Sequence, residues 1–481
     1  MRFTIATALL LIAGSARSEQ WLQRYHDAQH TSFISVPVDP MVNETFRYVF
    51  DAAEVDLGPN VHLIHYTDPK IEENGDMFVP VIERNGSVVT SSSVRKLSGG
   101  SDVWTFQSDW IRQPGSSWEP LFDFAVDQTA GDSGIVYAMG KYGCVWLLNE
   151  PDGMVLDKKC ATDSDPTGEP IWDVSPFTLD GNGNVFWTIR SNSGLIPSSL
   201  VKLDANGVIT TVAMADLAGA GQIAAMNSGP AVSADGNALY VATTLSGQSN
   251  GRLVAIDLTD PSLTTVLWAS PLTAQLGCPE ARLNDSGTSS PIALPDGGAA
   301  IGGWNTSPSS EGTYFSFDSN GNARGCYRFG WDDTMGQITL NGTTYLVGKH
   351  NHYFASSTQC NNGYDPPVNP PCYEIVVLDS TTMEKVWSYI AEDRDPVHGP
   401  YEWCIDAPTL HKITDEDGNE IGIVTAPSES GDLFQIQLLS IPPIETDFSV
   451  GGPQDAAYVP TVSIGGPAYT INHGQVIGIG Q

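Results

Sequence analysis

The stretch SPFTLDGNGNVFWTIR, residues 175–190, contains the pattern that decides the fold. A small residue and a proline open a short apolar strand, an Asp-Gly-Asn turn follows, and a second strand rich in aromatic and β-branched residues comes next. Three more segments repeat this order, namely 229–243 (GPAVSADGNALYVAT), 289–303 (SSPIALPDGGAAIGG) and 407–426 (APTLHKITDEDGNEIGIVTA). The recurring hairpin predicts a β-protein built from repeated units.

Looser copies of the same opening occur in the rest of the chain and define the period. The eight candidate unit starts are Pro69, Pro120, Pro176, Pro230, Pro291, Gly336, Pro408 and Pro460, with steps of 51, 56, 54, 61, 45, 72 and 52 residues. A second series of short apolar strands, each with an Asp or Asn at its end, recurs at Asn149, Asp204, Asp257, Asp318 and Asp379. A period of roughly 50 residues with several strands per unit indicates a β-propeller.

The predicted fold is therefore all-β, an eight-bladed propeller of four-stranded antiparallel blades over residues 19–481. The eighth unit is short, so seven blades are the alternative if residues 455–481 only wrap around the outside. The segment FRYVF (46–50) looks like an outer strand with no inner strands before it. We expect it to complete the last blade and so close the ring, which removes exposed sheet edges.

Composition and charge narrow the classes of partner. The 481 residues are 41% hydrophobic, enough for a large core, and acids outnumber bases 56 to 22. A net charge of -34 repels phosphate backbones and anionic membrane surfaces, so nucleic acid is excluded as a partner. After the N-terminal apolar run, no apolar stretch approaches the ~20 residues of a membrane helix. We expect an acidic monomer whose partner is a small molecule, a glycan or a protein.

The N-terminus indicates export. A basic start, an apolar run over residues 3–14 and small residues at Ala16 and Ser18 predict a signal peptide, residues 1–18. The expected location is secreted, or periplasmic in a bacterium. In a eukaryote, five N-x-S/T sequons would be glycan acceptors, which would make the protein a glycoprotein: Asn43, Asn85, Asn284, Asn305 and Asn341.

The seven cysteines are consistent with disulfides in an exported protein. If a hairpin turn is centred on Asp152, Cys144 and Cys160 face each other across two strands. Cys360 and Cys372 flank a Pro/Asn-rich insertion that a disulfide would close. Cys278 and Cys326 then pair by elimination and leave Cys404, although either of them could pair with Cys404 instead.

The densest polar cluster lies in two late segments, residues 348–354 and 393–406. In the repeat, segment 348–354 lies at the end of a second strand, and segment 393–406 precedes an innermost strand. These two positions lie on the same face of the ring, where propeller loops converge. Their histidines and carboxylates could form a metal site or an acid–base pair, and they favour a cation or a polyhydroxylated ligand. The candidate ligand-binding residues are His350, His352, Asp395, His398, Glu402 and Asp406.

Runs such as Asp180-x-Asn182-x-Asn184 resemble calcium loops, but the twelfth position of that run is Ser191 rather than Glu. Inter-strand turns favour the same residue types, because Asp and Asn hydrogen-bond their own backbone. The turn interpretation is the preferred one. The acidic run at Asp415, Asp417 and Asn419 is the one retained as a metal candidate.

The repeats resemble the PQQ-like (quinoprotein-type) β-propeller family. Residues 21–33 (WLQRYHDAQHTSF) are similar to the opening of many such chains, and 134–149 (GIVYAMGKYGCVWLLN) to their second and third strands. The resemblance implies either a binding or scaffold propeller without a catalytic set or, as the alternative, a PQQ- and calcium-dependent oxidoreductase of alcohols or sugars. The sequence has no adjacent cysteines, whose vicinal disulfide many alcohol-oxidising members contain. No catalytic residue is therefore assigned.

Overall fold

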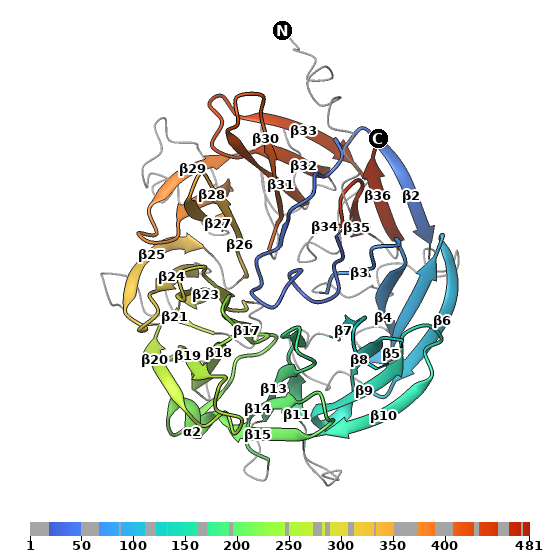
Figure 1. The fold of residues 1–481 in the computed structure, drawn as a ribbon, viewed down its shortest axis with the longest axis vertical. Coiled ribbons are helices and arrows are strands. Elements are labelled where there is room, and N and C mark those ends of the chain that lie inside the picture. Colours follow the sequence, from blue (N-terminus) through green and yellow to red (C-terminus); the bar gives the residue numbers. More distant parts are fainter. Residues whose placement is uncertain are drawn as a thin grey trace.

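The computed structural model describes most of the chain. The described residues are 19–49, 67–85, 88–110, 122–131, 133–161, 171–191, 196–245, 250–272, 281–283, 289–305, 312–330, 333–350, 374–389, 407–427, 432–450, 461–472 and 475–481. They form eight separate antiparallel sheets arranged in a ring around one axis (Figure 1). The eight-bladed prediction is confirmed, and the seven-bladed alternative is not needed.

Each blade has its innermost strand at the axis and its last strand at the rim. Blade 1 contains β3 (Lys70–Ile71), β4 (Met77–Asn85), β5 (Val88–Ser98) and β6 (Ser101–Ser108). Blade 2 contains β7 (Phe124–Asp127), β8 (Ile135–Met139), β9 (Cys144–Asn149) and β10 (Val155–Cys160). Blade 3 contains β11 (Ile171–Val174), β12 (Thr178–Leu179), β13 (Val185–Ser191), β14 (Ser199–Leu203) and β15 (Ile209–Ala213). Blade 4 contains β16 (Gln222–Ala224), β17 (Ala231–Val232), β18 (Ala238–Leu245), β19 (Arg252–Asp257) and β20 (Val266–Pro271).

The second half of the ring repeats this plan. Blade 5 contains β21 (Ala281–Arg282), β22 (Ile292–Ala293), β23 (Ala299–Asn305), β24 (Gly312–Phe317) and β25 (Ala323–Gly330). Blade 6 contains β26 (Gly336–Leu340), β27 (Thr343–His350), β28 (Glu374–Asp379) and β29 (Lys385–Tyr389). Blade 7 contains β30 (Thr409–Thr414), β31 (Glu420–Pro427), β32 (Asp432–Gln437) and β33 (Ile444–Ser449). Blade 8 contains β34 (Val462–Ser463), β35 (Ala468–Asn472), β36 (Gln475–Gly480) and, from the other end of the chain, β2 (Asn43–Val49).

Strand β2 closes the ring, as the sequence predicts. It pairs antiparallel with β36, with Arg47 opposite Ile477. Because a strand near the N-terminus supplies the outer strand of the last blade, that blade is complete only with strands from both ends of the chain. Within the described residues helical structure is limited to the short helix α2 (Met214–Ala218) and the 3₁₀ turn η2 (Lys141–Gly143), and no helix there is long and apolar enough to cross a bilayer.

The hydrophobic core lies between neighbouring blades. Outer-strand tryptophans bridge several of these interfaces, because each donates its indole N–H to a turn of the next blade. Trp104 donates to the Glu150 carbonyl oxygen at 3.0 Å, Trp268 to that of Ser319 at 3.1 Å and Trp387 to that of Ser440 at 2.9 Å. The turns approach the indoles closely, since a Cβ on Gly153 or Gly321 would lie 2.6 Å from the ring atoms. These contacts give each indole both packing and a hydrogen-bond acceptor.

The N-terminal segment, residues 19–39, makes a full circuit inside the ring and is visible as the dark blue trace near the axis in Figure 1. It contacts every blade in turn. Glu19 N–H donates to Ile464 O of blade 8, and Asp39 N–H returns to Gly466 O of the same blade. Between these points the segment bonds to Ile71, Val126, Leu179, Val232, Ala293, Gln337 and Leu410, one residue on the innermost strand of each of blades 1 to 7.

Such a circuit demands unusual backbone geometry. Tyr25, His26, His30 and Ser32 all have positive φ, between 52° and 79°. Non-glycine residues adopt this region at a cost, so the surrounding hydrogen bonds must hold it. Strand β1 (Phe33–Ile34) then runs parallel to β30 in blade 7. The segment therefore occupies the interior of the ring.

Candidate functional site

Charged side chains are buried at the loop end of blade 6, where β27 ends and β28 begins. His350 and Glu374 are a cross-strand pair, and His350 Nδ1 lies 2.7 Å from Glu374 Oε1. Glu374 is 0% exposed and His350 is 5% exposed. Lys385 Nζ, from β29, lies 3.1 Å from the same carboxylate oxygen. The three groups form a compact ionic cluster beside segment 348–354, which the sequence singles out.

Aromatic hydroxyls complete this cluster. The Tyr327 hydroxyl lies 3.0 Å from His350 Nδ1. Across the blade interface, the Tyr314 hydroxyl donates to Asp333 Oδ1 at 2.7 Å and lies 2.9 Å from the carbonyl oxygen of Lys349. Tyr314, Asp333 and Lys349 are each 0% exposed. We call Tyr314, Tyr327, Asp333, Lys349, His350, Glu374 and Lys385 the blade 6 cluster.

A glycine creates the space for this arrangement. A Cβ on Gly348 would lie 2.9 Å from the Tyr314 hydroxyl oxygen and 3.0 Å from Met335 Cγ. Both distances are shorter than normal side-chain contacts, so only glycine lets Tyr314 approach the end of β27. The missing side chain at Gly348 therefore lets the Tyr314 hydroxyl lie beside the end of β27.

The blade 6 cluster combines donors and acceptors at one point. The Glu374 carboxyl group lies against Nδ1 of His350 and so orients the imidazole. Lys385 adds a cationic donor beside Glu374, and Asp333 adds a second carboxyl group, which accepts a hydrogen bond from the Tyr314 hydroxyl. Such a set can hydrogen-bond a polar ligand or move a proton between a histidine and a bound group.

The other candidate ligand residues fall outside the described part of the chain. His350 is described and lies in the blade 6 cluster. The remaining candidates lie outside the described residues: His352, Asp395, His398, Glu402 and Asp406. They stay predictions, as do the Cys360–Cys372 disulfide and the signal peptide of residues 1–18, which lie outside the described residues too.

The acidic run at Asp415 forms a hydrogen-bonded turn. Asp415 Oδ1 accepts from the backbone N–H groups of Asp417 and Asn419, and Oδ2 accepts from Asn419 Nδ2 at 2.9 Å. Asp180 and Asp318 use their carboxylates in the same way within their own turns. Among the described residues no group of three or more His, Cys, Asp or Glu could hold a metal ion.

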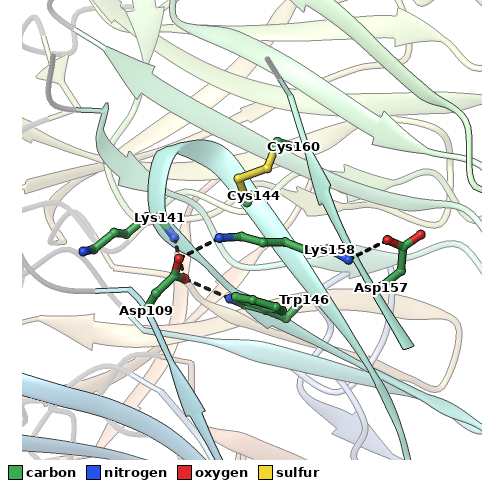
Figure 2. The surroundings of a disulfide bond; sticks show 7 residues. All are labelled: Asp109, Lys141, Cys144, Trp146, Asp157, Lys158 and Cys160. Atoms are coloured by element: carbon green, nitrogen blue, oxygen red, sulfur yellow. Dashed lines mark hydrogen bonds and ion pairs between the residues drawn. A yellow bond between two sulfur atoms is a disulfide. The ribbon is translucent and has the colours of Figure 1, made fainter. Parts of the chain in front are cut away.

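The Cys144–Cys160 disulfide is present in blade 2, as the hairpin register predicts (Figure 2). A bulge between Val155 and Asp157 shifts the register near the turn, and the two cysteines lie directly opposite each other beyond it. Cys326 is also disulfide-bonded, while Cys278 and Cys404 lie outside the described residues.

The described sequons differ in their surroundings. Asn43 is exposed at the start of β2, and Asn341 is exposed in the turn before β27, where its N–H donates to Glu420 Oε2 at 2.7 Å. Asn85 ends β4 and Asn305 ends β23. Asn284 lies outside the described residues. Glycosylation of these residues stays a prediction.

A second buried ionic group anchors the N-terminal segment. Lys70 Nζ lies 2.8 Å from Asp68 Oδ1 and 3.3 Å from Asp123 Oδ1, and all three side chains are 0% exposed. Trp21 Nε1 donates to the other oxygen of Asp68. Burial raises the pKa of Asp123, and the charge of Lys70 opposes this rise. The group joins blades 1 and 2 to the segment that fills the ring.

The axis itself does not fit a quinone and calcium in the described residues. His30 lies there, with Nδ1 2.9 Å from Pro291 O and Nε2 3.3 Å from Thr178 Oγ1, so it bridges blades 3 and 5. Burial lowers the pKa of His30 to about 4 and keeps the ring neutral. The N-terminal segment occupies the interior of the ring, and no group of three or more His, Cys, Asp or Glu among the described residues could hold a metal ion. We therefore derive no step through PQQ.

The sequence pattern singled out segment 348–354 with His350 but not Glu374, Lys385 or Tyr327. One signal could have found Glu374, because a carboxylate begins the otherwise apolar strand EIVVLD (374–379). The axial course of residues 19–39 was also missed. Its residues carry no strand periodicity, since successive parts of the segment bond to different blades.

Comparison with known proteins supports the fold alone. No family model and no curated protein matches the sequence. A europium-containing methanol dehydrogenase superposes with a TM-score of 0.56 and 10% identity, covering 96% of this chain and 89% of that chain. A quinohemoprotein alcohol dehydrogenase from Comamonas testosteroni superposes with a TM-score of 0.53 and 13% identity, covering 97% of this chain and 77% of that chain. The chain thus has the PQQ-like β-propeller fold.

Proposed function

We propose that this chain is an exported PQQ-like propeller that acts as a binding or scaffold protein and takes up a small polyhydroxylated ligand at the loop end of blade 6. One observation carries the proposal. Lys349, His350 and Glu374 are buried at the ends of β27 and β28, at the edge of the sheet from which blade loops extend.

Burying charge is costly, and a packed β-sheet does not require it. Removing a lysine and a carboxylate from water costs several kcal/mol each, in order of magnitude, unless partners compensate. Clusters of this kind concentrate at functional sites. Apolar packing alone can hold the strands of a blade together without buried charges. Val347, Val377 and Trp387 pack in this way in blade 6.

The chemistry of the cluster favours hydroxyl groups. A sugar hydroxyl can donate to a carboxylate such as Glu374 and accept from an ammonium group such as that of Lys385, so one ligand can bond to both kinds of group. The candidate residues His352, Asp395, His398, Glu402 and Asp406 would add carboxylates and imidazoles on the same face. A net charge of -34 disfavours an anionic ligand there.

Calorimetric titration of the purified protein with glucose, galactose, mannitol and glycerol tests the proposal. We expect at least one to bind saturably, and Glu374→Gln to weaken it about tenfold by removing a buried charge-assisted acceptor. Lys412→Met, in blade 7, is the matched control because Lys412 pairs with Glu420 away from the cluster. Equal affinity in the wild type and Glu374→Gln would contradict the proposal.

A second arm addresses the oxidoreductase alternative. The protein is incubated with PQQ and Ca²⁺, and dye reduction is then measured with a panel of alcohols and sugars. Under the binding proposal we expect no quinone spectrum to persist after gel filtration and no dye reduction. Stoichiometric retention with turnover would replace the binding proposal with the oxidoreductase.

A further inference from the structure

A cavity of about 780 Å³ lies between the N-terminal segment and the turns that follow the innermost strands of blades 1, 2 and 3. Its size is in the range of small-molecule sites. Glu73 in blade 1, Gln128 in blade 2 and Gly181 in blade 3 line it, and all belong to the turn after an innermost strand. His350 is at the opposite end of its blade, where the second strand finishes. The cavity and the blade 6 cluster therefore lie on opposite faces of the ring.

The floor of the cavity is apolar. Leu22 of the N-terminal segment, Val126 of β7 and Leu179 of β12 form it, with exposures of 9%, 0% and 8%. Their backbones are held in place by the Leu22–Val126 hydrogen bond and by the two hydrogen bonds between Gln23 and Leu179. The floor is thus formed from three elements that the circuit of the N-terminal segment brings together.

The walls are acidic. Glu19, Asp27, Glu73 and Asp127 line the cavity, and none of its described lining residues is Lys or Arg. Burial raises the pKa of Asp27, but hydrogen bonds and charge from His26 and hydrogen bonds from Thr31 outweigh this, so the pKa stays below 3.8 and the group is ionised.

His26 is the one basic side chain of this lining. Its Nε2 lies 3.5 Å from Glu19 Oε2, and its Nδ1 lies 3.5 Å from Asp27 Oδ2. The described lining thus contains four acidic side chains and one basic side chain, which favours a cation over an anion in this cavity.

We propose that this cavity is a second binding site, for a small organic cation that joins an apolar body to a protonated amine. The apolar part would lie on Leu22, Val126 and Leu179, and the ammonium group would face the carboxylates of Glu19 and Glu73. Burying an alkyl chain supplies about 0.8 kcal/mol per methylene. Carboxylates around a partly enclosed hollow attract a cation and repel an anion. The site is independent of the function proposed for blade 6.

Three probes of equal length separate the contribution of the positive charge from that of apolar burial. They are hexylamine, 1-hexanol and hexanoate, each titrated calorimetrically into the full protein. We expect saturable 1:1 binding of hexylamine, weaker binding of hexanol and none of hexanoate. Raising NaCl from about 0.05 to about 0.5 M should weaken the amine but not the alcohol, because salt screens exposed charges.

Variants test the location. Glu73→Gln should weaken hexylamine about threefold, the effect of one partly exposed ion pair. Glu416→Gln is the matched control, since it removes the same charge from the corresponding exposed turn of blade 7. Gln20→Trp, at an exposed lining position, should fill the hollow and abolish binding of both amine and alcohol.

Each outcome decides the proposal once near-UV circular dichroism shows that the variants are folded. Selective loss in Glu73→Gln and Gln20→Trp supports it. Equal binding of the three probes, absence of hexylamine binding, or equal affinity in the wild type and Gln20→Trp would overturn it. Sugar binding at blade 6 is measured separately, so neither result depends on the other.

Discussion

The carbonyl oxygen of Leu22 accepts a 2.8 Å hydrogen bond from the backbone N–H of Val126, which joins the N-terminal segment to the innermost strand of blade 2. Equivalent bonds to the other blades make this segment an inner ring inside the outer ring of sheets. Strand β2 closes the outer ring by pairing with β36. The N-terminal part of the chain thus closes the fold twice, once at the axis and once at the rim.

Gln23 provides the first test of the inner ring. Its side chain accepts from Leu179 N–H at 2.8 Å and donates to Leu179 O at 3.3 Å. Gln23→Ala leaves two backbone groups of blade 3 without these partners, and we expect the free energy of unfolding to fall by about 1–3 kcal/mol. Urea denaturation followed by tryptophan fluorescence measures the change.

Gln20→Ala is the control for that variant. Gln20 is exposed in the same segment, so its loss should change stability by less than about 0.5 kcal/mol. If the two alanine variants unfold at the same urea concentration, the side-chain bridge to blade 3 does not stabilise the ring.

Gly348 tests the geometry of the blade 6 cluster. An added methyl group would approach the Tyr314 hydroxyl oxygen to 2.9 Å, so Gly348→Ala should displace Tyr314 from Asp333 and cost about 1–3 kcal/mol. Removing the hydroxyl in Gly348→Ala/Tyr314→Phe should relieve part of this clash. A double-mutant cycle from thermal unfolding measures the coupling, and strictly additive effects would argue against the close contact.

The sequence predicted the blades well because each blade repeats one local pattern. Asp180, Asp318 and Asp415 each cap a turn, and each turn separates strands whose apolar residues pack against the neighbouring blades. Strand β2 could be predicted for the same reason. Its sequence has the pattern of an outer strand, and no inner strands of its own blade precede it, so it had to pair with the last blade. The register inside one hairpin could also be predicted from the position of its turn, and it placed Cys144 opposite Cys160.

The axial circuit and the blade 6 cluster could not be predicted in the same way. Residues 19–39 obtain their hydrogen bonds from eight sheets, so no local periodicity records them. Glu374 reaches His350 only because β27 and β28 pair in one register, across 24 residues of sequence. Long-range register of this kind depends on the whole ring and has no local signal.

The Cys144–Cys160 disulfide should stabilise blade 2 measurably. It closes a loop with a sequence separation of 16, for which restriction of the unfolded chain predicts about 3 kcal/mol. Cys144→Ala/Cys160→Ala should lower the free energy of unfolding by this order in urea denaturation.

Lys158→Met is the matched control in the same hairpin. Lys158 Nζ lies 2.6 Å from Asp109 Oδ2 and 4.4 Å from the Trp146 ring (Figure 2), but the ion pair is partly exposed. Its loss should cost only about 0.2–1 kcal/mol. A double cysteine variant as stable as Lys158→Met would show that the disulfide adds little to the stability of the folded ring.

Stability should fall with acid because two histidines are buried neutral. Burial lowers the pKa of His411 to about 3 and that of His30 to about 4, both from 6.5. Below pH 6.5 the unfolded chain binds protons that the folded chain does not, so each histidine's contribution to stability is intact above that pH and is lost as pH falls towards its folded pKa.

The variant His411→Gln cannot bind this proton. Its stability relative to the wild type should therefore improve by about 2 kcal/mol between pH 6.5 and pH 5, measured by urea denaturation at each pH. His30→Gln should show the same trend from a lower starting stability, because it also loses the contact with Pro291 O. Parallel pH curves for the wild type and His411→Gln would mean that the pKa of His411 is the same in the folded and unfolded chain, and would contradict the prediction.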